Sequence, residues 1–325
     1  MLKINFRSYA DLHRALRHGL WRIPPTVDLV VGIPRSGVAP AAAIASHLSI
    51  PFMTLSQFVE GGSPEFGQTR TVRADVRVGL AAGHVLLVDD SIALGRAMGR
   101  AREAVAASDF KGQLSTLAVY SSFMGKRLVD LSLEVLPSPR VFEWNILNHW
   151  LLEHSCVDID GVLCQDPTLV QRVTSHRFGR FAIETSALIR PKYVLSDVVT
   201  SRQEKYRGAT EHWLGVSGIR YRRLHMMPNA SAVERFAFEP HAEFKGRVFR
   251  QSHASLFIES DSRQAARINQ IAGKPVLAWD IAEVFDSQQG IHLASRFDVS
   301  RGLLRRVVRT AMSSFGRTRI REAIE

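Results

Sequence analysis

The sequence predicts an α/β protein with two doubly wound, Rossmann-like domains. Three observations lead to this prediction. Short apolar runs such as residues 85–88 are too short for helices and suit buried parallel strands. Several runs lead into a glycine-containing turn and a helical segment, which is the order of a βα unit. Two series of such units lie on either side of Pro137 and Pro139, which mark a boundary.

Composition and charge restrict the classes of function. The chain has 325 residues, enough for two domains, and its 46% hydrophobic and 22% charged residues are ordinary for a globular protein. The net charge of +11 favours a polyanionic partner: a phosphate-bearing substrate, nucleic acid or an acidic membrane surface. Nucleic acid is the least favoured of the three, because no recognisable binding module accompanies the charge.

The cytoplasm is the expected location. Cys156 and Cys164 are the only cysteines, so the chain has no disulfide framework and suits a reducing compartment. Lys3, Arg7 and Asp11 interrupt any apolar run near the start, which argues against a secretory signal. No apolar run approaches the length of a membrane span.

Residues 1–140 are expected to form the first domain, a ladder of βα units. The predicted strands are residues 28–33, 51–55, 85–88, 113–120 and 131–136, and the predicted helices are residues 9–20, 41–48 and 98–107.

The strand at residues 85–88 ends in Asp89 and Asp90, followed by a turn around Gly95 and a helix. Backbone N–H groups at such a turn bind phosphate, and the helix dipole favours an anion. The carboxylates suit ribose hydroxyls or magnesium. The residues therefore indicate a site for a phosphorylated sugar, although a magnesium site alone or a capped helix explains the same pattern.

A second turn of this kind follows the strand at residues 28–33 and carries Arg35. The planar guanidinium group matches phosphate oxygens. Taken alone, a solvated arginine in a βα loop explains the turn equally well.

Residues 85–98 resemble the PRPP-binding signature of type I phosphoribosyltransferases, and residues 30–37 resemble the pyrophosphate loop of that family (PRPP is 5-phosphoribosyl 1-pyrophosphate). The resemblance implies that fold, with Asp89 and Asp90 as the catalytic pair on the ribose. Leu94 and Ala97 stand where the family commonly has threonine, which leaves backbone N–H groups as the phosphate donors. The residues implied for PRPP and pyrophosphate are Arg35, Ser36, Gly37, Asp89, Asp90, Ser91, Ala93, Leu94, Gly95, Arg96 and Ala97.

The polar residues 56–83 stand where this family has a catalytic hood that closes over PRPP. The resemblance implies phosphate contacts from Arg70 and Arg73, although a solvated loop accounts for either residue alone. In this family the ribose passes through an oxocarbenium-like state as pyrophosphate leaves with magnesium, so the protein mainly positions and stabilises charge. Inversion of the α-diphosphate implies a β-ribofuranosyl 5-phosphate product.

Residues 141–154 are apolar and aromatic, which predicts a connecting helix. A strand then ends at Asp158, with Asp160 two residues later and Gly161 next. Alternate residues of an extended segment face one side, so both carboxylates can meet one ligand. A calcium loop is the alternative, but the spaced oxygen ligands that it requires do not follow.

This Asp-x-Asp-Gly-Val segment resembles the signature of haloacid-dehalogenase-type phosphatases, which implies that fold for residues 155–299. The resemblance implies that Asp158 attacks phosphorus, that Asp160 is the general acid and base, and that magnesium bridges the site. Further stations follow in the family's order. They are Thr200, then Ser201 as second choice, with Arg202 and Lys245, for the phosphate, and Asp158, Asp160 and either Glu259 or Asp261 for the metal.

Residues 161–199 leave little room for the large cap of that family, so we expect little or no cap and a bulky phosphorylated substrate such as a polymer end. Residues 300–325 are basic and amphipathic. They either lie on an anionic membrane or pack on the second domain.

Together the resemblances indicate a PRPP-dependent phosphoribosyltransferase joined to a magnesium-dependent phosphatase, the second removing the 5-phosphate left by the first. The pair resembles the enzymes that install β-ribofuranose in bacterial capsules and O-antigens, which implies a lipid-linked glycan acceptor at the inner face of the membrane. One alternative is a nucleobase-like acceptor converted to a nucleoside, which a basic, aromatic pocket beside the PRPP loop would favour. The other is a PRPP-sensing, RNA-binding regulator, against which the Asp158 and Asp160 pair argues.

Overall fold

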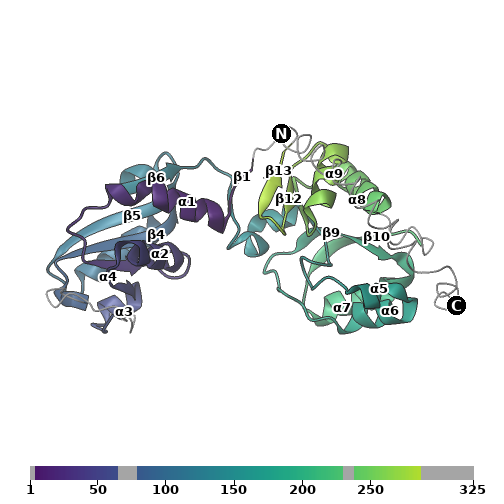
Figure 1. Cartoon of the computed structure of the whole chain (residues 1–325), viewed down its shortest axis with the longest axis horizontal. Helices are drawn as coiled ribbons and strands as arrows, with labels where there is room; N and C mark the ends of the chain where they lie inside the picture. The colour runs from purple at the N-terminus through teal and green to yellow at the C-terminus, as the bar shows by residue number, and fades with distance from the viewer. Residues whose placement is uncertain (1–3, 65–78, 230–237, 287–325) are drawn as a thin grey trace, which may run out of the picture. The chain divides into compact units, whose positions relative to one another are not determined.

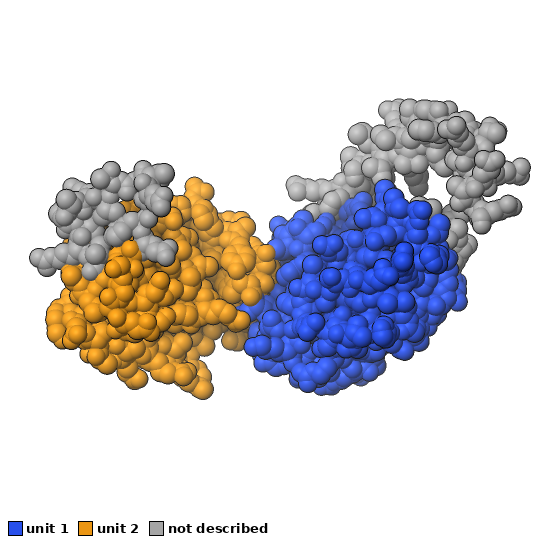
Figure 2. All heavy atoms as spheres, turned by 90° about the horizontal axis from the view of Figure 1, so that it is seen from below, with its two compact units in different colours: residues 1–2, 145–325 blue, residues 3–144 orange. Residues whose placement is uncertain are grey.

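The computed structural model describes residues 4–64, 79–229 and 238–286 and divides the chain into two compact units. The N-terminal unit spans residues 3–144 and the C-terminal unit begins at Asn145, and Figure 2 colours them orange and blue. Both are built on sheets of mainly parallel strands, which confirms the predicted α/β class (Figure 1). Arg70, Arg73 and the tail at 300–325 lie outside the described residues.

A five-stranded parallel sheet organises the N-terminal unit, in the order β3-β2-β4-β5-β6. Its strands are β2 (Leu29–Gly32), β3 (Phe52–Thr54), β4 (His84–Ile92), β5 (Gln113–Ser121) and β6 (Leu131–Val135). Its helices are α1 (Tyr9–Gly19), α2 (Val38–Leu48), α3 (Leu55–Val59) and α4 (Arg96–Ala106), with 3-10 turns η1 (Leu20–Arg22), η2 (Gly79–Ala81) and η3 (Gly125–Leu128).

Side chains alternate along these strands, so β2 and β4 contribute to two cores. Val30 and Leu86 belong to a core with residues of α1 and α2, whereas Val31 and Leu87 belong to a core with residues of α3 and α4. The sheet is therefore buried on both faces, which explains why its strands read as continuous apolar runs. The strand β4 continues past the predicted end, through Asp89 and Asp90 to Ile92.

Two predictions for this half are corrected. Residues 56–83 are not loop throughout, because Thr54 and Gln57 form a capping box that starts α3. The connecting helix predicted for residues 141–154 is wrong. The strand β7 (Arg140–Phe142) pairs in parallel with β1 (Asn5–Arg7), and the 3-10 turns η4 (Ile146–Asn148) and η5 (Trp150–His154) follow. Val141 and Phe142 are of β-branched and aromatic types that favour strands, and β1 supplies backbone partners.

The C-terminal unit contains a sheet in the order β10-β9-β8-β11-β12-β13, parallel except for β13, which is antiparallel to β12. Its strands are β8 (Ser155–Val157), β9 (Leu195–Gln203), β10 (Tyr221–Met227), β11 (Leu256–Glu259), β12 (Val276–Ala278) and β13 (Glu283–Phe285). Its helices are α5 (Leu169–Val173), α6 (Ser175–Glu184), α7 (Arg207–Val216), α8 (Phe238–Gln251) and α9 (Ser262–Ala272), with the 3-10 turn η6 (Glu204–Tyr206). None of the described helices is long and apolar enough to cross a membrane.

The turn between β2 and α2 touches the central strand at Gly37. A Cβ atom there would lie 2.6 Å from the carbonyl oxygen of Val88, 2.8 Å from that of Ile33 and 2.9 Å from the Cα of Asp89. All three neighbours are backbone atoms that cannot rotate away. Glycine is therefore required for this turn to lie against the carboxyl end of β4.

We expect Gly37→Ala to lower the free energy of unfolding of the N-terminal unit by roughly 1–3 kcal/mol, because the turn must move away from β4. Gly99→Ala is the matched control, since a Cβ at Gly99 in α4 meets nothing within 4 Å. The control should be neutral or stabilising by up to about 1 kcal/mol, because alanine favours helix. Thermal unfolding measures both, and equal stability of the two variants would contradict the close approach.

Candidate functional site

Two adjacent carboxylates lie near the carboxyl end of β4. Asp89 and Asp90 are both buried. Burial, together with the charge of Asp90, raises the pKa of Asp89 to about 8, and burial raises the pKa of Asp90 as well. A cation or hydroxyl donors from a ligand would offset the cost of keeping both groups ionised.

Trp144 holds one of these carboxylates. Its indole Nε1–H donates a 2.8 Å hydrogen bond to Oδ2 of Asp90. The indole ring stacks on Phe142 at 4.8 Å between centroids with an interplanar angle of 8°, and Phe142 stacks on Tyr120. The sequence reasoning missed Trp144 because it placed that residue in a connecting helix.

The structure brings the arginine-bearing turn beside the carboxylates, as predicted. The backbone N–H of Ile33 donates to the carbonyl of Val88 at 2.9 Å, which ties the start of the turn to β4. Arg35 is exposed on this turn. A pocket of about 190 Å³ lies here, lined by Tyr9, Leu12, Arg35, Ser36, Ala39 and Trp144.

The third part of this site is the turn after β4. Gly95 has a φ of +72° and precedes the first turn of α4, a conformation that glycine adopts without strain. No side chain of the described residues caps α4 at this end. Its first backbone N–H groups are thus available to an anion. Ala93, Leu94, Arg96 and Ala97 are exposed around the turn.

A second carboxylate site lies at the carboxyl ends of the central strands of the C-terminal unit. Lys245 on α8 donates from Nζ to Oδ2 of Asp158 at 2.7 Å and to Oε2 of Glu259 at 2.8 Å. All three side chains are buried. Burial raises the pKa of Asp158 well above its usual range, and the negative charge of Glu259 adds to this against the opposing effect of Lys245.

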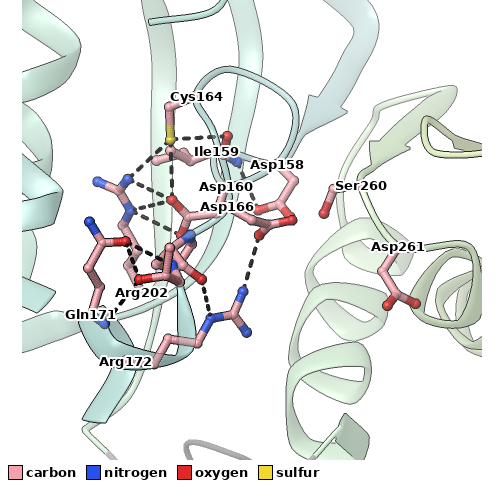
Figure 3. Close-up of polar contacts among 12 residues, drawn as sticks. Asp158, Ile159, Asp160, Cys164, Asp166, Gln171, Arg172, Arg202, Ser260 and Asp261 are labelled. Atoms are coloured by element: carbon pink, nitrogen blue, oxygen red, sulfur yellow. Dashed lines mark hydrogen bonds and ion pairs between the residues drawn. The ribbon is translucent and has the colours of Figure 1, made fainter. Parts of the chain in front are cut away.

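Arg202 is bound to Asp160 rather than free for a phosphate (Figure 3). Its Nη2 lies 2.7 Å from Oδ1 of Asp160, and its Nε lies 3.2 Å from both carboxylate oxygens. The guanidinium carbon also lies 5.6 Å from the ring centroid of Phe181 and 5.5 Å from that of Trp213. The predicted phosphate contact from Arg202 is replaced by a fixed partner for Asp160.

The structure separates Thr200 from Ser201, which alternate along β9. The hydroxyl of Thr200 accepts a hydrogen bond from the backbone N–H of Arg202 at 3.2 Å. The hydroxyl of Ser201 is buried, has no hydrogen-bond partner among the described residues and lines the pocket beside Asp158. Ser201, the second choice from sequence, is therefore better placed to bind a ligand oxygen.

The structure also separates Glu259 from Asp261. Glu259 contacts Lys245 in the buried cluster, whereas Asp261 caps α9 and forms an ion pair with Arg263 at 2.6 Å. Figure 3 shows the Asp261 side chain directed away from Asp158. Asp261 is thus committed to its helix, and Glu259 is the acidic residue that belongs to the site.

A pocket of about 100 Å³ opens over Asp158 and Lys245. The segment between β8 and β9 contributes to its wall through Arg172 on α5 and Phe178 on α6. The cover that these two short helices provide is small, which fits the expectation of little cap. Other pocket residues that the sequence reasoning missed are Asp166, Pro167, Gln203, Tyr206, His241, Ser260 and Gln264.

Comparison with known families now adds to this geometry. Residues 9–126 match the family described as phosphoribosyl transferase domain. This part of the chain is a phosphoribosyl transferase domain. Its match spans α1 to η3 and includes the Arg35 turn and both carboxylates of β4. A search of curated proteins found no match to the chain.

Solved structures that are similar to part of this chain include phosphoribosyltransferases. A xanthine-guanine-hypoxanthine phosphoribosyltransferase of Helicobacter pylori is 11% identical, with a TM-score of 0.34, and the match covers 44% of this chain and 95% of that one. A purine phosphoribosyltransferase of Pyrococcus horikoshii is 18% identical, with a TM-score of 0.34 and coverages of 44% and 94%. An orotate phosphoribosyltransferase of Aeropyrum pernix is 20% identical, with a TM-score of 0.27 and coverages of 39% and 71%.

Magnesium fits the chemistry of the second site. Among the described residues no group of three or more histidine, cysteine or acidic side chains is assembled to hold a metal. Asp158 and Glu259 nevertheless share a single ammonium group, so a second cation is needed to keep both carboxylates ionised. Proteins hold magnesium through one or two carboxylates, and water and substrate phosphate complete its shell. Asp158 and Glu259 would hold it here.

The raised pKa of Asp89 predicts a pH dependence for the phosphoribosyl transferase domain. The native state retains a proton that the unfolded chain has lost, so this stabilisation is present near pH 4 and lost as the pH rises to about 8. Asp89→Asn should unfold like wild type near pH 4 and be more stable at pH 8.5. Urea unfolding without metal or PRPP measures this, with the exposed Asp109→Asn as control. A difference in stability between Asp89→Asn and wild type that does not change with pH would contradict the prediction.

We expect Trp144→Phe to weaken PRPP binding about threefold to tenfold, because a net hydrogen bond contributes roughly 0.5–1.5 kcal/mol. The phenyl ring keeps the stacking on Phe142 and removes only the N–H that holds Asp90. Titration calorimetry with PRPP and magnesium measures the change, with the exposed Trp21→Phe as control. Wild-type affinity in both variants would show that the bond to Asp90 does not matter for PRPP.

Proposed function

We propose that the chain is a bifunctional enzyme. The phosphoribosyl transferase domain transfers ribose 5-phosphate from PRPP to an acceptor, and the C-terminal unit then removes the 5-phosphate. The observation that carries the second activity is Lys245, which bridges Asp158 and Glu259 beneath a pocket large enough for a phosphoryl group.

In the transfer step, charged and polar groups that the fold already holds in position bind PRPP. Asp89 and Asp90 bind the ribose hydroxyls, with Trp144 orienting Asp90. The backbone N–H groups of the Gly95 turn bind the 5-phosphate, and Arg35 stabilises the leaving pyrophosphate. Magnesium bound with PRPP would supply positive charge next to the pyrophosphate. Such positioning and preorganised charge supply most of the catalysis expected for a dissociative sugar transfer.

The topology of the C-terminal unit supports a phosphatase of the haloacid-dehalogenase type. The strand β8 is central, with β9 and β11 on either side. Because the strands are parallel, their carboxyl ends bring Asp158, Ser201 and Glu259 to one edge of the sheet. Asp158 and Ser201 thus line one pocket, and Glu259 reaches it through Lys245, which also lines it.

The hydrolysis takes two steps. In the first, an oxygen of Asp158 attacks phosphorus, the bond from phosphorus to the ribose 5-oxygen breaks, and Asp160 gives a proton to that oxygen. In the second, water attacks phosphorus and gives its proton to Asp160, the bond from phosphorus to the Asp158 oxygen breaks, and inorganic phosphate leaves. Lys245 favours the ionised form of Asp158, and Arg202 fixes the position of Asp160.

We further propose a glycan acceptor, with the finished product a β-ribofuranosyl residue of a bacterial polysaccharide. Removal of the 5-phosphate makes the addition irreversible and suits a neutral polymer unit. This acceptor rests on the resemblance of the two-domain pattern to the pair of enzymes that builds such polymers.

A nucleobase-like acceptor is the second candidate, and one observation favours it. The pocket beside Arg35 presents the rings of Tyr9 and Trp144, whose centroids lie 5.2 Å apart. Flat apolar rings next to a cationic group bind a base by stacking. Incubation with PRPP and either nucleobases or oligosaccharides, followed by pyrophosphate release, distinguishes the acceptors.

Asp158→Asn should leave pyrophosphate release unchanged and abolish phosphate release, so that a phosphorylated ribosyl product accumulates. The reason is that the amide cannot form the aspartyl-phosphate. Mass spectrometry of the product and separate assays of pyrophosphate and phosphate measure the two steps. Asp261→Asn is the matched control and should retain phosphate release, because Asp261 only caps α9. Dephosphorylated product made by Asp158→Asn at the wild-type rate would refute the proposed phosphatase.

A further inference from the structure

An unusual surface lies at the carboxyl edge of the N-terminal sheet, in the turns that follow β4 and β5. Leu94 is 71% exposed, Phe123 72% and Met124 68%, and Leu128 is exposed next to them. We call these four residues the apolar tip. Single exposed apolar residues are ordinary, but a cluster of large ones marks an interaction surface.

The two turns form one surface. The hydroxyl of Ser122 donates to the carbonyl of Ala93 at 3.1 Å. A Cβ atom built at Gly95 would lie 2.8 Å from Cδ1 of Leu128, and one at Gly125 would lie 2.7 Å from the carbonyl oxygen of Ile92. The two turns that carry the apolar tip therefore contact each other, although they lie about thirty residues apart in the sequence.

Basic residues accompany the apolar tip. Lys126 and Arg127 are exposed between Met124 and Leu128, and Arg96 and Arg100 are exposed on α4 directly after Leu94. Residues 91–102 and 121–129 contain no acidic residue. The charged side chains of these two segments are thus all basic.

We propose that the apolar tip docks the N-terminal unit onto an anionic lipid surface. Large apolar side chains enter the boundary between headgroups and acyl chains, and neighbouring lysine and arginine attract acidic headgroups. A second copy of the chain fits less well, because a twofold contact through this surface would bring the basic residues of one copy close to those of the other. The observed charge therefore favours acidic lipid.

The location of this surface connects it to the transferase. Leu94 belongs to the turn between β4 and α4, so docking would bring the mouth of the PRPP site to the membrane. That consequence rests on the proposed function and suits a lipid-linked acceptor. Docking itself does not depend on catalysis and is measured without PRPP.

A polarity-sensitive fluorophore on the full chain tests the proposal. Phe123→Cys and the control Leu169→Cys introduce single exposed thiols, since the native Cys156 and Cys164 are buried. With vesicles of phosphatidylglycerol and phosphatidylcholine, the label at position 123 should shift to the blue, and the label at position 169 should not. An unshifted label at position 123 overturns the proposal whether or not the chain sediments with vesicles. A shift that grows with protein concentration and no vesicles overturns it in favour of self-association.

Substitutions test the two contributions to binding. Phe123→Ser with Met124→Ser should lower partition into acidic vesicles by at least about tenfold, because two large side chains no longer enter the lipid. Lys126→Glu with Arg127→Glu should also lower partition into acidic vesicles. In this variant partition should no longer depend on the phosphatidylglycerol content. The pair Leu169→Ser and Val170→Ser, equally apolar and exposed in the other unit, should have no effect. Equal losses of vesicle binding in all three double variants would refute docking through the apolar tip. Pyrophosphate release with a soluble acceptor reports separately on the proposed transferase.

Discussion

The desolvation of carboxylates at the ends of parallel strands is the constraint on which both sites depend. Burial disfavours the ionised form of Asp89, Asp90 and Asp158, and the raised pKa values of all three express that cost. The two units offset it differently. In the N-terminal unit a neutral indole N–H reaches Asp90, whereas in the C-terminal unit the ammonium of Lys245 reaches two carboxylates. Both arrangements remain short of positive charge, which a magnesium ion would supply.

Close backbone approach makes room for these groups. Gly37 lets the β2–α2 turn lie against the carboxyl end of β4, and a side chain there would meet main-chain atoms. In the C-terminal unit, Gly161 has a φ of +81°, and a Cβ there would lie 2.4 Å from Cβ of Ser260. At each site, a loop thus lies close enough to a strand end for groups of both to contact one ligand. Substitution at either glycine would move the loop away from the strand end that carries the carboxylates.

Side chains that are neighbours in the sequence make different contacts in the second site, and their sequence spacing does not reveal which. Thr200, Ser201 and Arg202 are consecutive, yet one hydroxyl is bonded to backbone, the next is free to meet a ligand, and the arginine holds Asp160. The same holds for Glu259 and Asp261, which divide between the buried cluster and a helix cap. The pocket therefore offers a ligand fewer free polar side chains than the number of polar residues at the strand ends suggests.

The sequence by itself determined the α/β class, the apolar strands and the carboxylates that follow them, because burial on both faces of a parallel sheet imposes continuous apolar runs. The glycine and the acidic residues around Asp89 and Asp90 also predicted a ligand site at a strand end, and their resemblance to a family signature indicated a transferase. Only the tertiary structure decided that residues 140–142 pair with β1, that Trp144 holds Asp90, and that Arg202 belongs to Asp160. Those contacts join residues 42 or more positions apart, and no local pattern records which distant groups will meet.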